Sequence, residues 1–374
     1  MRDPRLNTLA SVLVNYSTAV RKGDLVRIGG ELPGMPLMEA IFEETLRAGG
    51  NPFFQLSSDT SDDAFFRLAS EEQLAYVNPV NQFMVDKIDV YFGIWADENT
   101  KSRSNVDPQK QSVASQARKP FLKRLLDRAA KGELRWTGTQ FPTNGSAQDA
   151  EMSLFEYSDF VFRAGLLHLP DPVAAWKKLS EKQQRLADFL NGKEEVRVIG
   201  KETDIRFGVQ GRRWVNCDGH ENFPDGEVFT GPIEDATEGT IRYSFPAVHH
   251  GREVHDIVLT FKAGKVVDAR ATKGADFLMS MIDQDPGARI LGEFAIGTNF
   301  GIKKYTKNTL FDEKIGGTCH AALGAAYPET GGKNDSGLHW DMVCDLRAAD
   351  CRILADGETI LEAGRFTRQE WPQP

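Results

Sequence analysis

The sequence predicts a two-domain protein, with an α/β domain and a mainly parallel sheet over residues 1–190 and an α+β, β-rich domain over residues 191–374. Three observations lead to this fold class. The chain of 374 residues exceeds the roughly 250–300 residues at which one hydrophobic core stops growing. Short apolar strands alternate with helical patterns in the first half, as in crossover connections of a parallel sheet. Strand and hairpin signals dominate the second half.

The first half shows the alternation element by element. Apolar residues recur at helical spacing over residues 6–16 and 37–46. Between them, Asp24–Gly30 has the pattern of a short strand that leaves through its glycines. Further strands are predicted at 52–56, 88–95 and 134–139, separated by helical stretches such as 111–131. This order predicts a mainly parallel sheet covered by helices.

The pattern changes after two helical segments that extend from about Ala147 to Leu190. Strand signals begin at Val196, and a hairpin is predicted across Ala263-Gly264. Asp356-Gly357 has the composition of one more hairpin turn. We therefore expect a domain boundary near residue 191 and a β-rich second domain.

Composition narrows the class of protein. The chain carries 54 acidic and 45 basic side chains, a net charge of −9, which opposes nucleic-acid binding by bulk electrostatics. No stretch approaches the ~18–20 apolar residues of a membrane span, and the amino terminus lacks the apolar core of a signal peptide. The four cysteines form no CxxC pair. We expect a cytoplasmic protein without a nucleic-acid or membrane partner.

The segment Ser336–Met342 contains the most informative pair of side chains. In an extended strand, residues two apart point to the same face, so His339 and Asp341 would present an imidazole and a carboxylate side by side. Such a pair suits a metal ion. A surface strand with two outward polar residues, and with Trp340 and Met342 inward, explains the same pattern.

A second candidate segment follows Gly317. If it is helical with Thr318 near its cap, His320 and Tyr327 lie two turns apart on one face, where a metal ligand and a phenol could meet one substrate. The alternative is an amphipathic helix with an edge histidine. Gly324 inside the segment weakens the helical interpretation itself.

Isolated glutamates complete the candidate set. A Pro-Asp-Gly turn places Glu227 at the start of a short apolar strand, and Glu293 lies inside an apolar run bracketed by glycines. A buried carboxylate is costly unless it is paired or bound to metal. Together with Glu313, His320, His339 and Asp341, the two glutamates make a ligand set of nitrogen and oxygen atoms. Such a set suits paired divalent ions. Surface glutamates, or a structural zinc held by Cys319 or Cys344 with histidine, remain alternatives, although the spacing fits no zinc finger.

Five segments, taken in order, resemble one known family. They are Pro224-Asp-Gly-Glu-Val-Phe-Thr-Gly-Pro232, Gly292-Glu-Phe294, Leu310-Phe-Asp-Glu313, Cys319-His-Ala-Ala-Leu-Gly-Ala-Ala-Tyr-Pro328 and His339-Trp-Asp-Met342. With the length and the α/β region before them, they resemble the thermophilic-type metalloaminopeptidases of peptidase family M29, also called aminopeptidase T or S. The form found here is similar to a subgroup called leucyl aminopeptidase.

The resemblance implies a dinuclear site and a homodimer. By this resemblance Glu293 would bridge the ions or assist proton transfer, and Tyr327 matches the catalytic tyrosine. Zinc or cobalt is implied, while manganese or magnesium also accepts such ligands. The residues that match the metal ligands are Glu227, Glu293, His320, His339 and Asp341. Glu313 is a sixth candidate whose role is less secure, because Lys314–Cys319 makes the segment before the motif histidine longer than is typical of the family.

We therefore expect a dinuclear metal-dependent aminopeptidase that hydrolyses the amino-terminal residue of short peptides. Two alternatives stay open. A metal-dependent amidase could use the same site on a non-peptide amide. A nucleotide or small-molecule binding protein could use the first domain, where Gly29-Gly30-Glu-Leu-Pro-Gly34 follows a strand. That segment lacks the G-x-G-x-x-G order of a phosphate-binding loop and is more simply a glycine turn.

Overall fold

The computed structural model describes residues 2–249 and 251–374, and the chain forms two compact units. One comprises the chain up to Val173 together with Gly219–Phe223. The other comprises Ala174–Asp218 together with Pro224–Pro374. The fold class predicted from the sequence is confirmed, because the first unit holds a parallel α/β sheet and the second is β-rich and antiparallel. The boundary near residue 191 stays a prediction.

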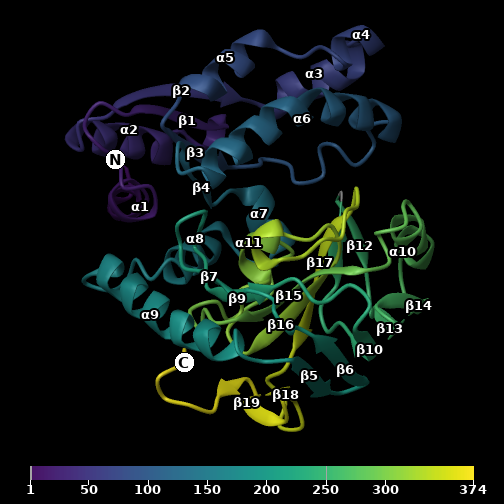
Figure 1. Ribbon diagram of the computed structural model, residues 1–374. Coiled ribbons are helices and arrows are strands. Elements are labelled where there is room, and N and C mark those ends of the chain that lie inside the picture. Colours follow the sequence, from purple (N-terminus) through teal and green to yellow (C-terminus); the bar gives the residue numbers. More distant parts are fainter. Residues whose placement is uncertain (1, 250) are drawn as a thin grey trace. The chain divides into compact units, whose positions relative to one another are not determined.

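The first unit is built on a five-stranded parallel sheet in the order β2-β1-β3-β4-β8. Helices α5 and α6 cover one face, where Val85 and Leu125 form a hydrophobic cluster with Phe53 and Tyr91, and α2 contacts β1 and β2 (Figure 1). The strands are β1 (Leu25–Glu31), β2 (Asn51–Ser57), β3 (Val90–Trp95), β4 (Arg135–Gln140) and β8 (Asn222–Phe223). The helices are α1 (Pro4–Val12), α2 (Met35–Arg47), α3 (Asp59–Leu68), α4 (Glu71–Leu74), α5 (Pro79–Lys87), α6 (Pro108–Ala130), α7 (Asn144–Asp149) and α8 (Leu154–Ala164).

The glycine segment of this unit differs from the sequence prediction. Gly29 and Gly30 lie inside β1, which continues to Glu31, and a short 3-10 turn over Leu32–Gly34 follows. A Cβ atom on Gly30 would lie 2.6 Å from the carbonyl oxygen of Ile94 on β3. The glycine therefore permits the close approach of two strands, and the predicted turn begins only after Glu31.

The second unit consists mainly of two antiparallel sheets, which follow helix α9 (Pro172–Leu190) in the chain. The larger sheet has the order β14-β13-β10-β6-β5-β18-β19-β20, and the smaller has the order β17-β16-β15-β9-β7. Strands of the larger sheet are β5 (Glu195–Gly200), β6 (Thr203–Gly208), β10 (Thr237–Arg242), β13 (Val258–Lys262), β14 (Lys265–Arg270), β18 (Arg352–Ala355), β19 (Glu358–Glu362) and β20 (Arg365–Phe366). Strands of the smaller sheet are β7 (Val215–Cys217), β9 (Glu227–Thr230), β15 (Leu291–Gly297), β16 (Thr318–Gly324) and β17 (His339–Asp345).

Shorter elements complete this unit. They are the pair β11 (Ala247–His249) and β12 (Arg252–Val254), and the helices α10 (Ala275–Ile282) and α11 (Thr309–Asp312). Both predicted hairpin turns are confirmed, because Ala263-Gly264 joins β13 to β14 and Asp356-Gly357 joins β18 to β19. All four turn residues have positive φ angles, as the tight hairpin turn requires.

The core of the second unit lies between the two sheets. Phe207 of β6 stacks on Phe294 of β15 with ring centroids 4.5 Å apart, and Ile296 and Trp340 belong to the same buried cluster. Because neighbouring residues on a strand point to opposite faces, Glu293 and Asp341 are directed to the other face of the smaller sheet. No helix among residues 2–249 and 251–374 combines the length and apolar character needed to cross a membrane.

Candidate metal centre

Four adjacent strands of the smaller sheet bring the predicted ligands to one face. The antiparallel register pairs Glu227 of β9 with Gly297 of β15, and Ala295 of β15 with His320 of β16. On β17, Asp341 pairs with Ala322 and His339 with Gly324. Glu293, Ala295 and Gly297 share a face of β15 because they are two residues apart. The five strand-borne ligands predicted from the sequence therefore lie together.

Small residues make room for these side chains. The cross-strand partner of Glu293 is Ala322, which is also the partner of Asp341 on the other side, and His320 faces Ala295. Glycine faces both Glu227 and His339. Since a directly opposite side chain would normally fill the space above the sheet, this alternation leaves a hollow into which the carboxylates and imidazoles converge.

Glu293 lies between the two histidines. Its Oε1 is 3.3 Å from Nε2 of His320, and its Oε2 is 3.4 Å from Nε2 of His339. Asp341 also reaches both imidazoles, at 3.8 Å from His320 and 3.6 Å from His339. Glu227 Oε2 is 3.6 Å from His320 Nε2. A carboxylate that offers one oxygen to each side has the arrangement expected of a bridging ligand.

The histidines are oriented through their other ring nitrogen. Nδ1 of His320 is 2.9 Å from the carbonyl oxygen of Glu313, and Nδ1 of His339 is 2.9 Å from that of Ala325. Donation from Nδ1–H to a backbone carbonyl leaves Nε2 as the nitrogen that can bind an ion once it has lost its own proton, and it is Nε2 that faces the carboxylates. Metal-binding histidines are typically held in this way.

The predicted helix after Gly317 is wrong, because residues 318–324 form the central strand β16, which is buried along its whole length. His320 and Tyr327 therefore do not share a helix face. Tyr327 follows the strand, and its ring packs on those of His339 and Phe229, with centroids 5.2 and 5.3 Å away. The phenol thus still lies beside the site, although through packing against β17 rather than through helical spacing.

Glu313 reaches the cluster after helix α11. One of its carboxylate oxygens lies within 4.8 Å of ligand atoms of His320 and Asp341. The longer segment after it turns back along β15, where the amides of Gly316 and Gly317 donate to the carbonyls of Asn299 and Gly297. Gly317 has a φ of +85°, which favours glycine. The extra residues thus form a glycine-dependent turn.

Sequence reasoning missed two charged residues of the site. Lys314 is fully buried, and its Nζ pairs with Glu313 and lies 3.7 Å from Glu227 and 4.0 Å from Asp225. Asp225, in the Pro-Asp-Gly turn, is 1 % exposed. In the sequence, Lys314 directly follows the candidate ligand Glu313 and precedes an isoleucine. This position next to a candidate ligand was the one sequence feature that could have indicated a role in the site. Its ammonium group supplies a fixed positive charge at the Glu227 and Glu313 side of the cluster.

The pKa values reflect crowded, buried charges. Burial raises the pKa of Glu227 well above its usual range, and burial raises that of Asp341 to about 6. Burial lowers the pKa of His320 and His339, but the surrounding carboxylates outweigh it and raise both to about 10. The pKa of Lys314 is raised by Glu227, Glu313 and Asp225 despite its burial. The cluster therefore favours bound cations.

The residues present fit a metal ion. Three buried or half-buried groups of ligand atoms lie within 4.8 Å of one another: Glu227, Glu293 and His320; Glu293, His339 and Asp341; and Glu313, His320 and Asp341. The Oε2 atom of Glu227 is buried and forms no hydrogen bond with the described residues. A buried carboxylate oxygen without a donor is costly, and a divalent cation would satisfy it. The donor set of carboxylates and imidazoles suits such an ion.

The cysteines contribute little to this cluster. Cys319, Cys344 and Cys351 are free and buried, and Cys319 faces Cys344 across the β16–β17 pair on the core side of the sheet. They pack as small apolar residues. Cys217 is the exception, since its Sγ lies within 4.8 Å of ligand atoms of Asp225 and Glu227.

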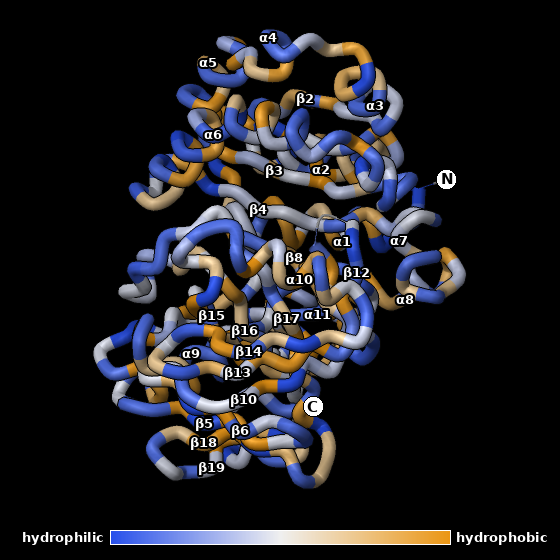
Figure 2. Tube along the Cα trace, turned by 90° about the vertical axis from the view of Figure 1, so that its right-hand side faces the viewer, coloured by the Kyte–Doolittle hydropathy of each residue, from blue (hydrophilic) through white to orange (hydrophobic). Residues whose placement is uncertain are grey.

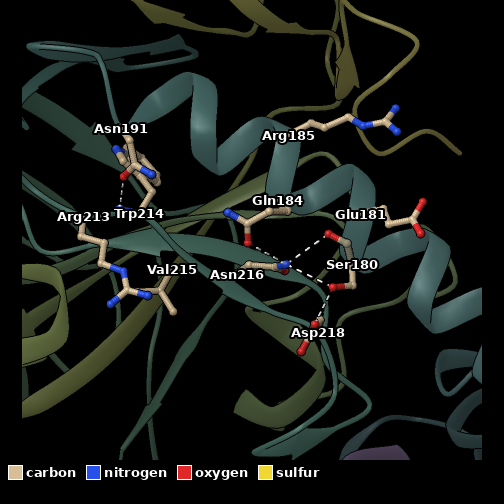
Figure 3. Close-up of a pocket in the computed structure, with 10 residues that line it drawn as sticks. All are labelled: Ser180, Glu181, Gln184, Arg185, Asn191, Arg213, Trp214, Val215, Asn216 and Asp218. Atoms are coloured by element: carbon tan, nitrogen blue, oxygen red, sulfur yellow. Dashed lines mark hydrogen bonds between the residues drawn. The ribbon is translucent and has the colours of Figure 1, made fainter.

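A polar cavity of about 540 Å³ in the same unit is separate from the ligand set. It lies beside α9 and β7 (Figure 3), and none of the six predicted ligands lines it. Ser180 Oγ donates to Asp218 at 2.5 Å, and Asn216 Nδ2 donates to the Ser180 carbonyl at 3.1 Å. These bonds connect the helix to the edge strand and indicate a structural role.

Carboxylates and imidazoles are the ligands that many metal-dependent enzymes use to hold divalent ions. The smaller sheet directs side chains of both kinds to one face, so the site has the composition of that class of enzyme. The chain belongs to the thermophilic metalloprotease family M29, whose family model matches residues 2–366. The match includes all six candidate ligands and Tyr327. The protein is thus a member of a metalloprotease family with a candidate buried metal site.

The chain is also similar to individual proteins. Aminopeptidase 2 of Geobacillus stearothermophilus is 27% identical, and the match covers 96% of this chain and 94% of that protein. The structure of wild-type AmpT from Thermus thermophilus superposes with a TM-score of 0.86 at 24% identity, over 98% of this chain and 99% of the other. A 2,5-dihydroxypyridine dioxygenase from Pseudomonas putida shares the fold at a TM-score of 0.60 and 14% identity, with 98% of both chains covered.

Proposed function

We propose that the protein is a dinuclear aminopeptidase, which removes the amino-terminal residue of short peptides. The observation that carries the proposal is the position of Glu293, whose two carboxylate oxygens face the Nε2 atoms of two different histidines. The relatives named above support the substrate class, since one is called an aminopeptidase. The two donor groups that share Glu293 would each hold one divalent ion, with zinc or cobalt as the proposed metals.

The chain's own side chains would perform the remaining steps. Divalent ions, when bound, polarise the scissile carbonyl and the attacking water. Glu293 would accept the proton of that water through a carboxylate oxygen that is not held by an ion, and would return it to the leaving amine. The Tyr327 hydroxyl donates a hydrogen bond to the developing oxyanion. The acidic surroundings of the cluster suit the positively charged α-amino group of a peptide.

Turnover of matched anilides tests the activity. The metal-loaded protein is expected to hydrolyse leucine anilide and to leave N-acetyl-leucine anilide intact, because only the first has a free α-amine. Equal hydrolysis of both would overturn the aminopeptidase and favour the amidase alternative. Absence of hydrolysis of either, in protein shown to hold metal, would overturn both. The proposed homodimer is tested separately by sedimentation of the same preparation.

Metal binding to the stripped protein is expected to release protons. With the pKa of His320 and His339 raised to about 10, both side chains are doubly protonated imidazolium cations at pH 8 when no ion is bound. An ion requires the neutral imidazole and the ionised carboxylate, so saturation should release about two protons per chain from the imidazoles and any proton that Glu227 carries, and affinity should rise with pH up to about pH 10. Calorimetry of metal binding in two buffers of different ionisation enthalpy measures the number of protons released per chain. His339→Gln should release about one proton fewer, and no net release in the parent protein would contradict the assignment.

Glu313→Gln and Lys314→Met are expected to change metal affinity in opposite directions. A neutral amide is a poorer ligand, so Glu313→Gln should weaken one ion selectively. Lys314→Met removes a buried cation that pairs with Glu313 and lies 3.7 Å from Glu227, so the ion on that side should bind more tightly. Titration of each stripped variant, followed by metal analysis, measures both affinities. If both variants weaken the same ion, Lys314 instead positions Glu313 for ligation, and unchanged affinity in Glu313→Gln would remove Glu313 from the ligand set.

A further inference from the structure

A second cavity lies in the first unit, within residues that the proposed peptidase function does not use. Its volume is about 500 Å³, and it lies between the sheet and helices α3 to α6. Arg27 of β1 and Gln55 of β2 line it from the sheet, and Phe121 lines it from α6. In Figure 2, hydrophilic and hydrophobic segments alternate along α5 and α6, which cover this face of the sheet.

Arg27 is a half-buried cation without an anionic partner among the described residues. Its Nε and Nη1 atoms are buried and form no hydrogen bond with the described residues. The guanidinium instead stacks on the ring of Tyr91 at 4.2 Å and lies 5.6 Å from the ring of Phe121. Burial lowers the pKa of Arg27, and no carboxylate offsets that effect. Because a buried guanidinium normally pairs with an anion, the charge is left for a ligand to satisfy.

The lining of the cavity has the opposite charge to the chain as a whole. The chain carries a net charge of −9, yet the lining contains Arg27 and Arg118 and no aspartate or glutamate. Its other polar groups are side-chain amides and the hydroxyl of Tyr76, and the amide of Gln55 donates through Nε2 to Asn81 Oδ1 at 3.2 Å. The two guanidinium groups, with no carboxylate beside them in the lining, favour an anion that accepts hydrogen bonds.

Apolar side chains surround the same cavity. Tyr76 is 65% exposed, Leu122 is 53% exposed and Val77 is 40% exposed, and all three line it. Large apolar side chains left in water around a concave site mark a surface that contacts an apolar ligand. The cavity therefore presents the guanidinium group of Arg27 on its sheet side and apolar side chains where it meets the solvent.

We propose that this cavity binds a small organic carboxylate with an apolar body, whose carboxylate pairs with Arg27 and whose body packs on Tyr76 and Leu122. A guanidinium and a carboxylate match in shape as well as in charge. Gly29, two residues along β1, leaves room for the guanidinium, because a Cβ atom there would lie 3.3 Å from Nη2 of Arg27. The site is independent of the metal centre.

Calorimetry with three probes tests the proposal on the metal-loaded protein. The protein is expected to bind 4-phenylbutyrate, to bind the neutral 4-phenylbutanamide at least about tenfold more weakly, since hydrogen bonds to charged groups are the stronger ones, and to bind inorganic phosphate more weakly than the acid. Equal affinity for the acid and the amide overturns the role of charge. Equal affinity for phosphate overturns the role of the apolar body. Absence of binding of the acid overturns the site.

The affinities of single-residue variants for 4-phenylbutyrate test whether the acid binds in this cavity. Arg27→Met should lose at least about tenfold in affinity for the acid, whereas Arg47→Met, which changes a surface arginine paired with Glu44, should not. His339→Ala should also keep the affinity, and its loss there would place the acid at the metal centre. Because the Arg27 guanidinium has no ion pair to lose, Arg27→Met should fold with an unchanged or higher Tm. If it fails to fold, Ala117→Trp on α6 fills the cavity instead, and retained binding in that variant overturns the proposal.

Discussion

His339→Ala and Asp341→Ala are each expected to lose bound metal and at least about a hundredfold in turnover of leucine anilide, since ligand loss removes the ion that polarises the carbonyl. Both side chains leave the same face of β17, and both face Glu293 or His320 within 4 Å. Metal content and turnover are measured on the same preparation. Loss of both together indicates ligation, whereas loss of turnover alone would indicate a role in proton transfer or binding.

Two matched controls separate ligation from damage to the fold. His255→Ala removes an imidazole that pairs with Glu253 outside the cluster. Asp345→Ala removes a carboxylate of the same strand that pairs with Arg347. Both controls should keep their metal and their rate. Full metal occupancy and normal turnover in His339→Ala and Asp341→Ala would remove this pair from the metal site.

The strand pattern made much of the site predictable. Alternation alone placed His339 and Asp341 on one face of a strand, and the structure has that strand, with Trp340 and Met342 buried behind it. The Pro-Asp-Gly turn before Glu227 and the apolar run around Glu293 were equally local signals. What the alternation could not supply was the register of four strands, because strand pairing depends on contacts between segments far apart in sequence.

The segment around His320 shows where local propensity fails. Its alanines favour a helix, yet residues 318–324 form a strand between β15 and β17. Pairing on both edges and complete burial outweigh the intrinsic preference, which is more easily overridden in a central strand. The alanines have another use there, since Ala322 leaves space beside Glu293 and Asp341.

Lys314 was not predicted as part of the site, because a lysine next to a glutamate is most simply a surface ion pair, and such pairs contribute little. Only the tertiary structure shows that its side chain is fully buried among Glu227, Glu313 and Asp225. The turn at Gly316-Gly317 that carries the chain back to β15 is what places it there.

Tyr327→Phe is expected to reduce kcat by ~10²–10³ while metal content stays unchanged, because the loss of one donor to a developing oxyanion typically has that effect. The hydroxyl forms no hydrogen bond with the described residues, and the residue is 40% exposed, so a substrate can reach it. Partial desolvation of the phenol by the surrounding residues and the charges of Glu293 and Asp341 raise the pKa of Tyr327. The phenol thus stays protonated, and it remains a donor at working pH.

The fold should tolerate this change. The Tyr327 carbonyl accepts hydrogen bonds from the amide and the hydroxyl of Thr330, at 3.1 and 2.6 Å, and these bonds persist in the variant. The ring contacts with His339 and Phe229 also remain. Tyr305→Phe is the matched control, since its hydroxyl donates to the Pro246 carbonyl. That variant should lose some stability and keep its kcat. If Tyr327→Phe turns over leucine anilide at the parent rate, the phenol only packs against His339, and the oxyanion donor must be sought elsewhere in the chain.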